Sequence, residues 1–169
     1  EEINRILTDH VSKFLFCSSE EGVKQLKKEG VVNNVYNVGD IMQDAVRLFL
    51  PKAKKPEFSD FDFTKRYNLV TIHRPANTNS MKVMQEILNG LANLPRINIW
   101  PLHPRIKNAI TKLNIPENTI ICDPFSYFEM LYVLNNCYKV LTDSGGLQKE
   151  AYWLQKPCIT IRPQTEWVE

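Results

Sequence analysis

Long apolar runs are missing from this sequence of 169 residues. No stretch approaches the roughly 20 consecutive apolar residues of a membrane-spanning helix. We therefore expect no transmembrane segment and no membrane partner. A basic-then-apolar leader is also missing, and the sequence opens at Glu1-Glu2-Ile3 without a methionine. We therefore expect the chain to be a piece of a longer protein.

No concentrated basic stripe is present either, since the formal net charge is only +2 and the lysines are scattered along the chain. Proteins that bind nucleic acids gather positive charge on one face. We therefore expect no nucleic-acid partner, and we interpret the charged residues as solvated faces.

Closely spaced cysteine pairs, which indicate zinc sites or redox motifs, are likewise absent. The four cysteines are Cys17, Cys122, Cys137 and Cys158, and three of them lie in apolar, strand-like runs. We interpret all four as reduced core residues, with no disulfide and no metal. Reduced thiols predict a cytoplasmic location.

Short apolar runs alternate with segments of helical period, which is typical of parallel βαβ units. The predicted strands cover residues 14–17, 35–38, 69–72, 97–101, 119–122, 139–142 and 158–161. The predicted helices lie near residues 20–29, 40–49, 80–94, 104–113, 126–136 and 145–155. The pattern predicts an α/β fold with a parallel, Rossmann-like sheet.

Residues 51–66 interrupt the alternation with two prolines, four lysines and three phenylalanines that lack helical spacing. We interpret this segment as an interdomain linker. Residues 1–50 would then be the tail of one α/β domain, and residues 67–169 a second, Rossmann-like domain. We expect both domains to be incomplete.

Within residues 139–150 a tight polar turn joins a predicted strand to a predicted helix. The first N–H groups of a helix lack partners within it and carry the positive end of its dipole. Ser144, Gly145 and Gly146 can therefore donate to a phosphate. Glu150, further along the helix, can accept hydrogen bonds from ribose hydroxyls. A capped helix with a flexible turn is the alternative interpretation.

Polar or aromatic segments follow five of the predicted strands, at residues 71–74, 101–105, 123–127, 142–146 and 162–167. The carboxyl ends of parallel strands meet at one edge of a sheet, where ligands bind, so we expect these segments to line one crevice. His73 and His103 lie on that edge, His73 directly before Arg74. Histidine with arginine suits a phosphate-bearing ligand, and a structural role is the alternative for each histidine.

With these residues the chain resembles the non-hydrolysing UDP-N-acetylglucosamine 2-epimerases, a family with a two-domain fold like that of GT-B glycosyltransferases. The resemblance runs nearly end to end and rests on several motifs in the same order. The motifs are Glu1-Glu2-Ile3-Asn4-Arg5 with Thr8-Asp9-His10, Val38-Gly39-Asp40 with Asp44-Ala45, His73-Arg74, His103-Pro104-Arg105, Thr142-Asp143-Ser144-Gly145-Gly146 with Gln148 and Glu150, and Arg162 with Thr165-Glu166.

The resemblance implies a role for each site residue. It places the diphosphate on Ser144, Gly145 and Gly146, and the ribose on Glu150. It places His73 and Arg74 near the diphosphate, with His73 also as a catalytic residue. It places the uracil against the backbone of Met130, with Phe125 also lining the nucleotide. It connects His103 with an effector nucleotide-sugar site found in some members. It implies no metal and no cofactor.

The implied reaction interconverts UDP-N-acetylglucosamine and UDP-N-acetylmannosamine for surface polysaccharide synthesis, in a parent protein that is a homodimer. UDP leaves by elimination to give a 2-acetamidoglucal and then adds back with the opposite configuration at C2. Proton transfer at carbon needs positioned carboxylates. The resemblance assigns one of them to Glu1 and the others to sequence upstream, so we expect this chain alone to be inactive.

The chain departs from the family pattern at three positions. Ala76 replaces the usual glutamate three residues after the motif histidine, which removes a carboxylate near the site. Trp167 replaces a common arginine, and a tryptophan there can stack on a ligand. Asp40 replaces a common asparagine, and we expect that change to be neutral.

Two other classes of protein fit parts of the pattern. A GT-B glycosyltransferase or a hydrolysing epimerase would share the diphosphate turn and the ribose carboxylate, although the His-Arg and His-Pro-Arg segments together argue against a transferase. A nucleotide-sugar-binding module without catalysis is the third interpretation, supported only by Ala76 and Trp167.

Overall fold

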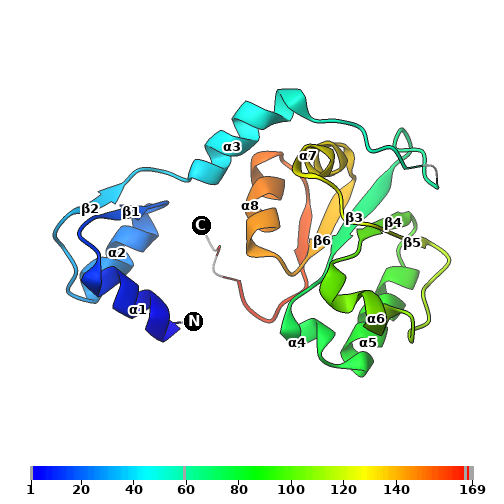
Figure 1. Cartoon of the computed structure of the whole chain (residues 1–169), viewed down its shortest axis with the longest axis horizontal. Coiled ribbons are helices and arrows are strands. Elements are labelled where there is room, and N and C mark those ends of the chain that lie inside the picture. Colours follow the sequence, from blue (N-terminus) through cyan, green and yellow to red (C-terminus); the bar gives the residue numbers. More distant parts are fainter. Residues whose placement is uncertain (1, 59, 166, 168–169) are drawn as a thin grey trace. The chain divides into compact units, whose positions relative to one another are not determined.

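The computed structural model describes residues 2–58, 60–165 and 167, except for the side chains of Arg105 and Asn108. The chain forms two compact units, Glu1–Ala45 and Val46–Glu169, and we describe each unit by itself. Figure 1 labels their helices and strands. Within the described part, no helix is both long enough and apolar enough to cross a membrane.

The first unit contains α1 (Glu2–Val11), β1 (Leu15–Cys17), α2 (Glu20–Lys28) and β2 (Val35–Asn37). The two strands are parallel, with Leu15 opposite Val35. Leu15, Cys17 and Leu26 form a small core between the strands and α2. Helix α3 (Ile41–Phe49) begins in the first unit and ends in the second.

The second unit is built on a five-stranded parallel sheet in the order β5-β4-β3-β6-β7. Its strands are β3 (Tyr67–Thr71), β4 (Ile97–Pro101), β5 (Thr119–Cys122), β6 (Lys139–Thr142) and β7 (Cys158–Thr160). Its helices are η1 (Leu50–Lys52), α4 (Pro75–Thr78), α5 (Met81–Ala92), η2 (Pro104–Ile106), α6 (Lys107–Ile110), α7 (Tyr127–Asn136) and α8 (Gly145–Trp153).

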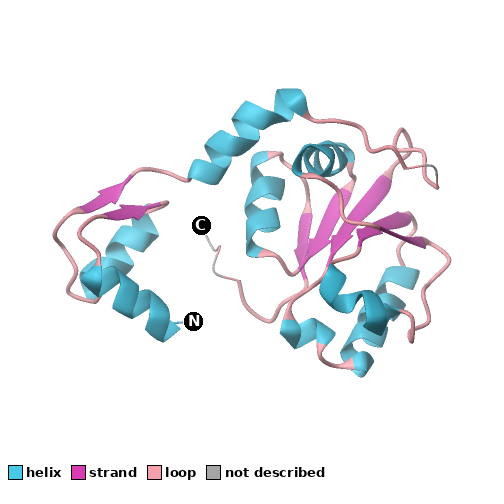
Figure 2. Cartoon of the chain, in the orientation of Figure 1, coloured by secondary structure: helices cyan, strands magenta, loops and turns pink. Residues whose placement is uncertain are grey.

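Helices cover both faces of this sheet, as Figure 2 shows. Successive residues of a strand point to opposite faces, so β3 contributes Leu69 to one core and Val70 to the other. The first core includes residues of α7 and α8, such as Leu134, and the second includes residues of α5, such as Leu88. Burial on both faces explains why the central strands are almost continuously apolar.

Residues 51–66 belong to the second unit, because their aromatic side chains pack on its first core. Phe63 is buried and lies edge-on to Tyr67, with ring centroids 5.4 Å apart. Phe61 makes a similar contact with Tyr67 at 5.5 Å. The structure thus divides the chain near residue 45, whereas the proposed linker role of residues 51–66 in a larger protein stays a prediction.

Each strand expected from the sequence is present, with its ends shifted by at most two residues. The expected helix at 104–113 is shorter and consists of η2 and α6, and helices α1 and α4 were not expected. The interpretation of Cys158 as a core residue is wrong: Cys17, Cys122 and Cys137 are buried, but Cys158 is exposed. Strand β7 is one of the two edge strands of the sheet, and all its residues are exposed, whereas Cys122 on the other edge strand, β5, is buried.

Tyr67 offers a test of the core. Its ring is fully buried, and its hydroxyl donates to the carbonyl of Val133 at 2.8 Å, joining β3 to α7. We expect Tyr67→Phe to lower the free energy of unfolding by about 1 kcal/mol, because one buried hydrogen bond is lost without a change in shape. Tyr152→Phe is the matched control, since Tyr152 is 73% exposed. Urea unfolding measures the free energy of unfolding of both variants. An equal loss in the two variants would contradict a stabilising role for the Tyr67 hydrogen bond.

Candidate functional site

The five segments predicted to line one crevice lie at the carboxyl edge of the second unit's sheet, because all its strands run in the same direction (Figure 1). Side-chain contacts join neighbouring segments. The rings of His73, after β3, and His103, after β4, lie with centroids 5.3 Å apart. Thr165, after β7, donates to the side chain of Gln148 on α8 at 2.7 Å. The prediction of a shared edge is confirmed.

The turn after β6 leads directly into α8. Ser144 is the residue before the helix, and its hydroxyl accepts the N–H of Leu147 at 3.4 Å. The N–H of Ser144 itself donates to the hydroxyl of Thr142 at 2.9 Å. Gly145 and Gly146 form the first turn of the helix, where N–H groups have no partner within the helix. The turn therefore has the geometry of an anion-binding helix start.

Asp143 holds the turn after β6 against the loop after β3. Its side chain is completely buried. The carboxylate accepts the N–H of Arg74 at 2.8 Å and the N–H of His73 at 3.0 Å. The guanidinium of Arg74 in turn donates through Nε to the main-chain oxygen of Asp143 at 2.8 Å. The two loops are thus joined by side-chain and main-chain hydrogen bonds.

Asn77 extends this connection to a third strand. Its side-chain nitrogen donates to the carboxylate of Asp143 at 3.0 Å and to the main-chain oxygen of Ile161, after β7, at 2.9 Å. Sequence reasoning did not single out Asn77. The signal for it was weak, because an asparagine in the turn after a strand is common for purely local reasons.

Glu150 lies on α8 and is only 8% exposed. Burial raises the pKa of its carboxyl group above the ordinary value, and a hydrogen bond with the Tyr127 side chain opposes that shift. Burial, together with Glu150, raises the pKa of the Tyr127 hydroxyl. Tyr127 begins α7, so this pair connects the segment after β5 with the helix after β6. The sequence places Tyr127 in the segment 123–127 at this edge but does not indicate its pairing with Glu150, because the two residues lie on different helices.

The segment after β5 carries Phe125 and Met130. Ser126 between them begins α7 with a capping box, in which its hydroxyl and the carboxylate of Glu129 each bond the other residue's main chain. Both Phe125 and Met130 are half-buried and pack against the first core of the sheet. The ring of Phe125 lies 6.1 Å from that of Phe63, so the core fixes its position.

The remaining predicted site residues differ in how they are placed. His103 is exposed and lies beside His73. Trp167 lies next to α8, with the ammonium of Lys149 4.2 Å from the centre of its ring. Glu1, predicted as a catalytic carboxylate, lies outside the described residues.

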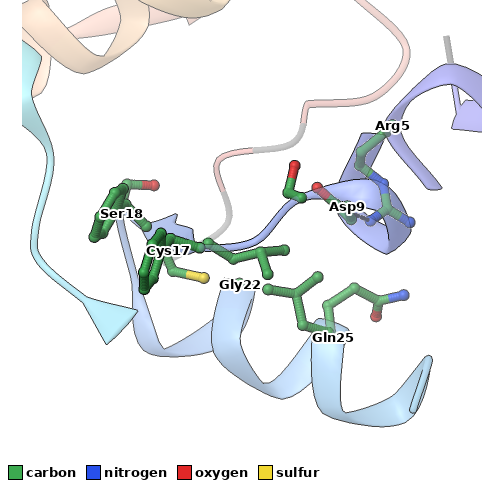
Figure 3. Close-up of a pocket in the computed structure, with 11 residues that line it drawn as sticks. Arg5, Asp9, Cys17, Ser18, Gly22 and Gln25 are labelled. Carbon is green, nitrogen blue, oxygen red and sulfur yellow. Dashed lines mark hydrogen bonds and ion pairs between the residues drawn. The ribbon is translucent and has the colours of Figure 1, made fainter. Parts of the chain in front are cut away.

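The first unit has a separate hollow of about 430 Å³ between α1, β1 and α2, shown in Figure 3. Arg5 lines it, but the guanidinium is already held by Glu2 at 2.8 Å, Asp9 at 2.8 Å and Glu29 at 2.6 Å. Three carboxylates around one guanidinium leave the surroundings negatively charged. We therefore assign no anion site to this hollow.

Another hollow, of about 400 Å³, adjoins the carboxyl ends of β4 and β5 in the second unit. Leu102 and Ile121 contribute to its apolar lining, while Lys107 and Asp123 form an ion pair at 3.5 Å. The hollow thus lies on the same edge of the sheet as the histidines.

The raised pKa of Glu150 gives a pH-dependent prediction. A carboxyl group with a raised pKa in the folded state costs stability once it ionises, so the cost is absent well below its ordinary pKa and complete above the raised one. Glu150→Gln should therefore gain stability relative to the wild type as the pH rises from about 4 to about 8. Thermal unfolding at both pH values measures this difference. Glu86→Gln, at an exposed position on α5, is the control, and a pH-independent difference for Glu150→Gln would refute the prediction.

Comparison with known proteins adds independent evidence. The family model described as UDP-N-acetylglucosamine 2-epimerase matches residues 1–169. A UDP-N-acetylglucosamine 2-epimerase homolog of Methanococcus maripaludis is 41% identical to this chain. The match covers 100% of this chain and 50% of the homolog. The UDP-2,3-diacetamido-2,3-dideoxy-D-glucuronate 2-epimerase of Pseudomonas aeruginosa is 42% identical, and the match covers 100% of this chain and 49% of that protein.

Solved structures give the same result. The UDP-GlcNAc 2-epimerase of Methanocaldococcus jannaschii in complex with UDP-GlcNAc and UDP is similar with a TM-score of 0.87 and 36% identity, over 99% of this chain and 50% of that one. The UDP-GlcNAc 2-epimerase of Neisseria meningitidis bound to UDP-GlcNAc has a TM-score of 0.86 and 28% identity, over 99% of this chain and 49% of that one. The chain therefore spans about half the length of these relatives. It belongs to the UDP-N-acetylglucosamine 2-epimerase family, as its sequence motifs predict.

Proposed function

We propose that this chain is the UDP-binding part of an enzyme that inverts C2 of a UDP-2-acetamido sugar, with UDP-N-acetylglucosamine and UDP-N-acetylmannosamine as the interconverted pair. The observation that carries the proposal is the joining of His73, Arg74 and the Ser144 turn at one sheet edge, in a chain that matches the epimerase family throughout. A relative solved with UDP-GlcNAc and UDP supports the ligand class.

In this proposal the diphosphate binds at the start of α8. Gly145 and Gly146 offer main-chain N–H groups, the hydroxyl of Ser144 can donate as well, and the helix dipole adds partial positive charge. His73 and Arg74 approach from the loop after β3, which Asp143 bonds to the same turn. Donors from two loops can therefore contact one diphosphate.

The nucleoside binds beside the diphosphate. Glu150 accepts hydrogen bonds from the ribose hydroxyls, in a position where burial and the Tyr127 hydroxyl keep its carboxyl group in place. Phe125 and the backbone of Met130 line the uracil. Because both residues pack on the core, this part of the site is formed before the ligand binds.

The chemistry requires two bonds to break at neighbouring carbons. A base removes the proton from C2, the C1–O bond breaks, and UDP leaves with the bonding electron pair to give the 2-acetamidoglucal. UDP then adds back at C1 while a proton returns to C2 from the opposite face. Residues of this chain stabilise the negative charge that grows on UDP as it leaves. The proton transfers need carboxylates, of which Glu1 is the proposed member here.

The identity of the sugar has a second candidate. The Pseudomonas aeruginosa relative is named for UDP-2,3-diacetamido-2,3-dideoxy-D-glucuronate and is 42% identical over the whole chain. That sugar also carries an acetamido group at C2 and leaves UDP by the same bond, so the proposed UDP site serves either substrate. Product analysis of the parent protein with both sugar nucleotides separates the two candidates.

Further properties of the parent protein are proposed on the same basis. The parent is a cytoplasmic homodimer that supplies surface polysaccharide synthesis, and the free cysteines of this chain fit a reducing compartment. His103 contributes to an effector site for a nucleotide sugar, for which its exposed position beside His73 is suitable.

Calorimetric titration with UDP tests the proposed site. Ser144→Ala removes a hydroxyl from the diphosphate turn, and Glu150→Ala removes the ribose acceptor, so we expect UDP affinity to fall about threefold to tenfold in the first and at least about tenfold in the second.

The control variants remove a serine hydroxyl and a glutamate carboxylate from helix α5, away from the proposed site. Ser80 caps α5 by accepting the N–H of Val83 at 3.4 Å, the same contact that Ser144 makes, so Ser80→Ala reproduces the loss of a helix cap without affecting UDP. Glu86→Ala controls for Glu150→Ala. Equal affinity in all four variants would place UDP elsewhere, and no binding by the wild-type chain would refute the proposed binding function.

The proposal separates UDP binding from turnover in this chain. Because the chain spans half the length of its relatives and most of the proposed carboxylates lie in the other half, we expect it to bind UDP without forming UDP-N-acetylmannosamine from UDP-N-acetylglucosamine. Chromatography of the sugar nucleotides after prolonged incubation measures this. Any epimer above a protein-free control would show that this half of the protein is sufficient for catalysis.

A further inference from the structure

The most densely bonded side chain at the carboxyl edge is Asp143, a residue that does not itself need to contact a ligand. Its carboxylate is completely buried and accepts hydrogen bonds from the main chain of His73 and Arg74 and from the side chain of Asn77. A buried carboxylate is strongly unfavourable unless such donors surround it. These partners belong to the loop after β3 and to helix α4 that follows it. If that segment moved away, the buried carboxylate would lose its hydrogen-bond donors.

The ring of His73 also lies near the carboxylate of Asp143. Nδ1 of His73 lies 4.0 Å from the carboxylate of Asp143, which leaves Nε2 as the ring nitrogen that does not face it. The His73 side chain remains 37% exposed. Asp143 thus fixes the main chain of His73, while the imidazole stays partly exposed beside the ring of His103.

We propose that Asp143 is a positioning residue for the diphosphate: its carboxylate sets the loop after β3 against the turn after β6, so that donors of both loops meet the same ligand. The inference rests on the proposed function, because it assumes that UDP binds at this edge. Asp143 acts through His73 and Arg74, whereas Ser144 contacts the diphosphate directly.

This role predicts selectivity between two ligands. Uridine lacks the diphosphate and depends on the residues around Glu150, whereas UDP also uses the two loops. Asp143→Asn has nearly the same shape but places an amide N–H₂ where a carboxylate oxygen accepts N–H groups. We expect this variant to lose at least about tenfold in affinity for UDP and to bind uridine as the wild type does. A merely structural role would weaken both ligands together.

Asp62→Asn is the matched control. Asp62 also accepts a main-chain N–H, from Thr64 at 3.0 Å, and it lies in the segment before β3, at the opposite end of that strand from His73. We expect Asp62→Asn to leave the affinities for both UDP and uridine unchanged. Calorimetry measures the affinity for UDP. NMR titration of backbone amides measures the affinity for uridine, which binds more weakly.

The outcomes distinguish this inference from the function on which it rests. If Ser144→Ala weakens UDP but Asp143→Asn does not, Asp143 is no positioning residue and the UDP site stands. If the wild-type chain binds no UDP, both ideas fail. If Asp143→Asn does not fold, NMR of the wild type decides: UDP, but not uridine, must shift the amides of His73 and Arg74 together with those of Gly145 and Gly146. Failure of the His73 and Arg74 amides to respond to UDP would overturn the inference.

Discussion

The parallel pairing of β3 with β6 is the constraint on which the candidate site depends. The register sets Thr71 opposite Thr142, and the hydroxyls of these two residues lie 2.6 Å apart. The next residues, Ile72 and Asp143, therefore leave the sheet at the same level. From there the chain can make the bonds between Asp143 and the loop after β3. A shift of the register by one residue would turn Asp143 to the other side and remove the site.

The sequence predicts the parts of this arrangement that depend on local pattern. The strands are apolar runs bounded by polar turns, and the turn at Ser144 has the residues of a helix start, so both are visible without a structure. From the sequence, Asp143 is recognised only as a member of the Thr142-Asp143-Ser144-Gly145-Gly146 motif. Its bonds to the loop after β3 depend on a strand register that joins residues far apart in the sequence, and no local pattern contains that information.

The error at Cys158 has a related cause. Its apolar neighbours predict a strand, which is correct, but burial of a strand residue depends on what packs over that strand. Both β5 and β7 are edge strands, yet Cys122 on β5 is buried and Cys158 on β7 is exposed. Cys137, before the interior strand β6, is also buried. Burial raises the pKa of the Cys137 thiol to about 12, which makes it unreactive near neutral pH. Strand composition alone does not distinguish the two environments.

In the proposed function, UDP binding and epimerisation need not reside in the same half of the protein. Groups that hold the UDP moiety equally before and during the reaction increase affinity without lowering the barrier. Acceleration requires donors that interact more strongly with UDP as negative charge grows on it, and N–H groups held at a fixed helix start meet this requirement. They act only when a base removes the C2 proton at the same time. In the proposed reaction, the edge around Ser144 and Asp143 therefore supplies the leaving-group side, while the rate depends on carboxylates held near C2.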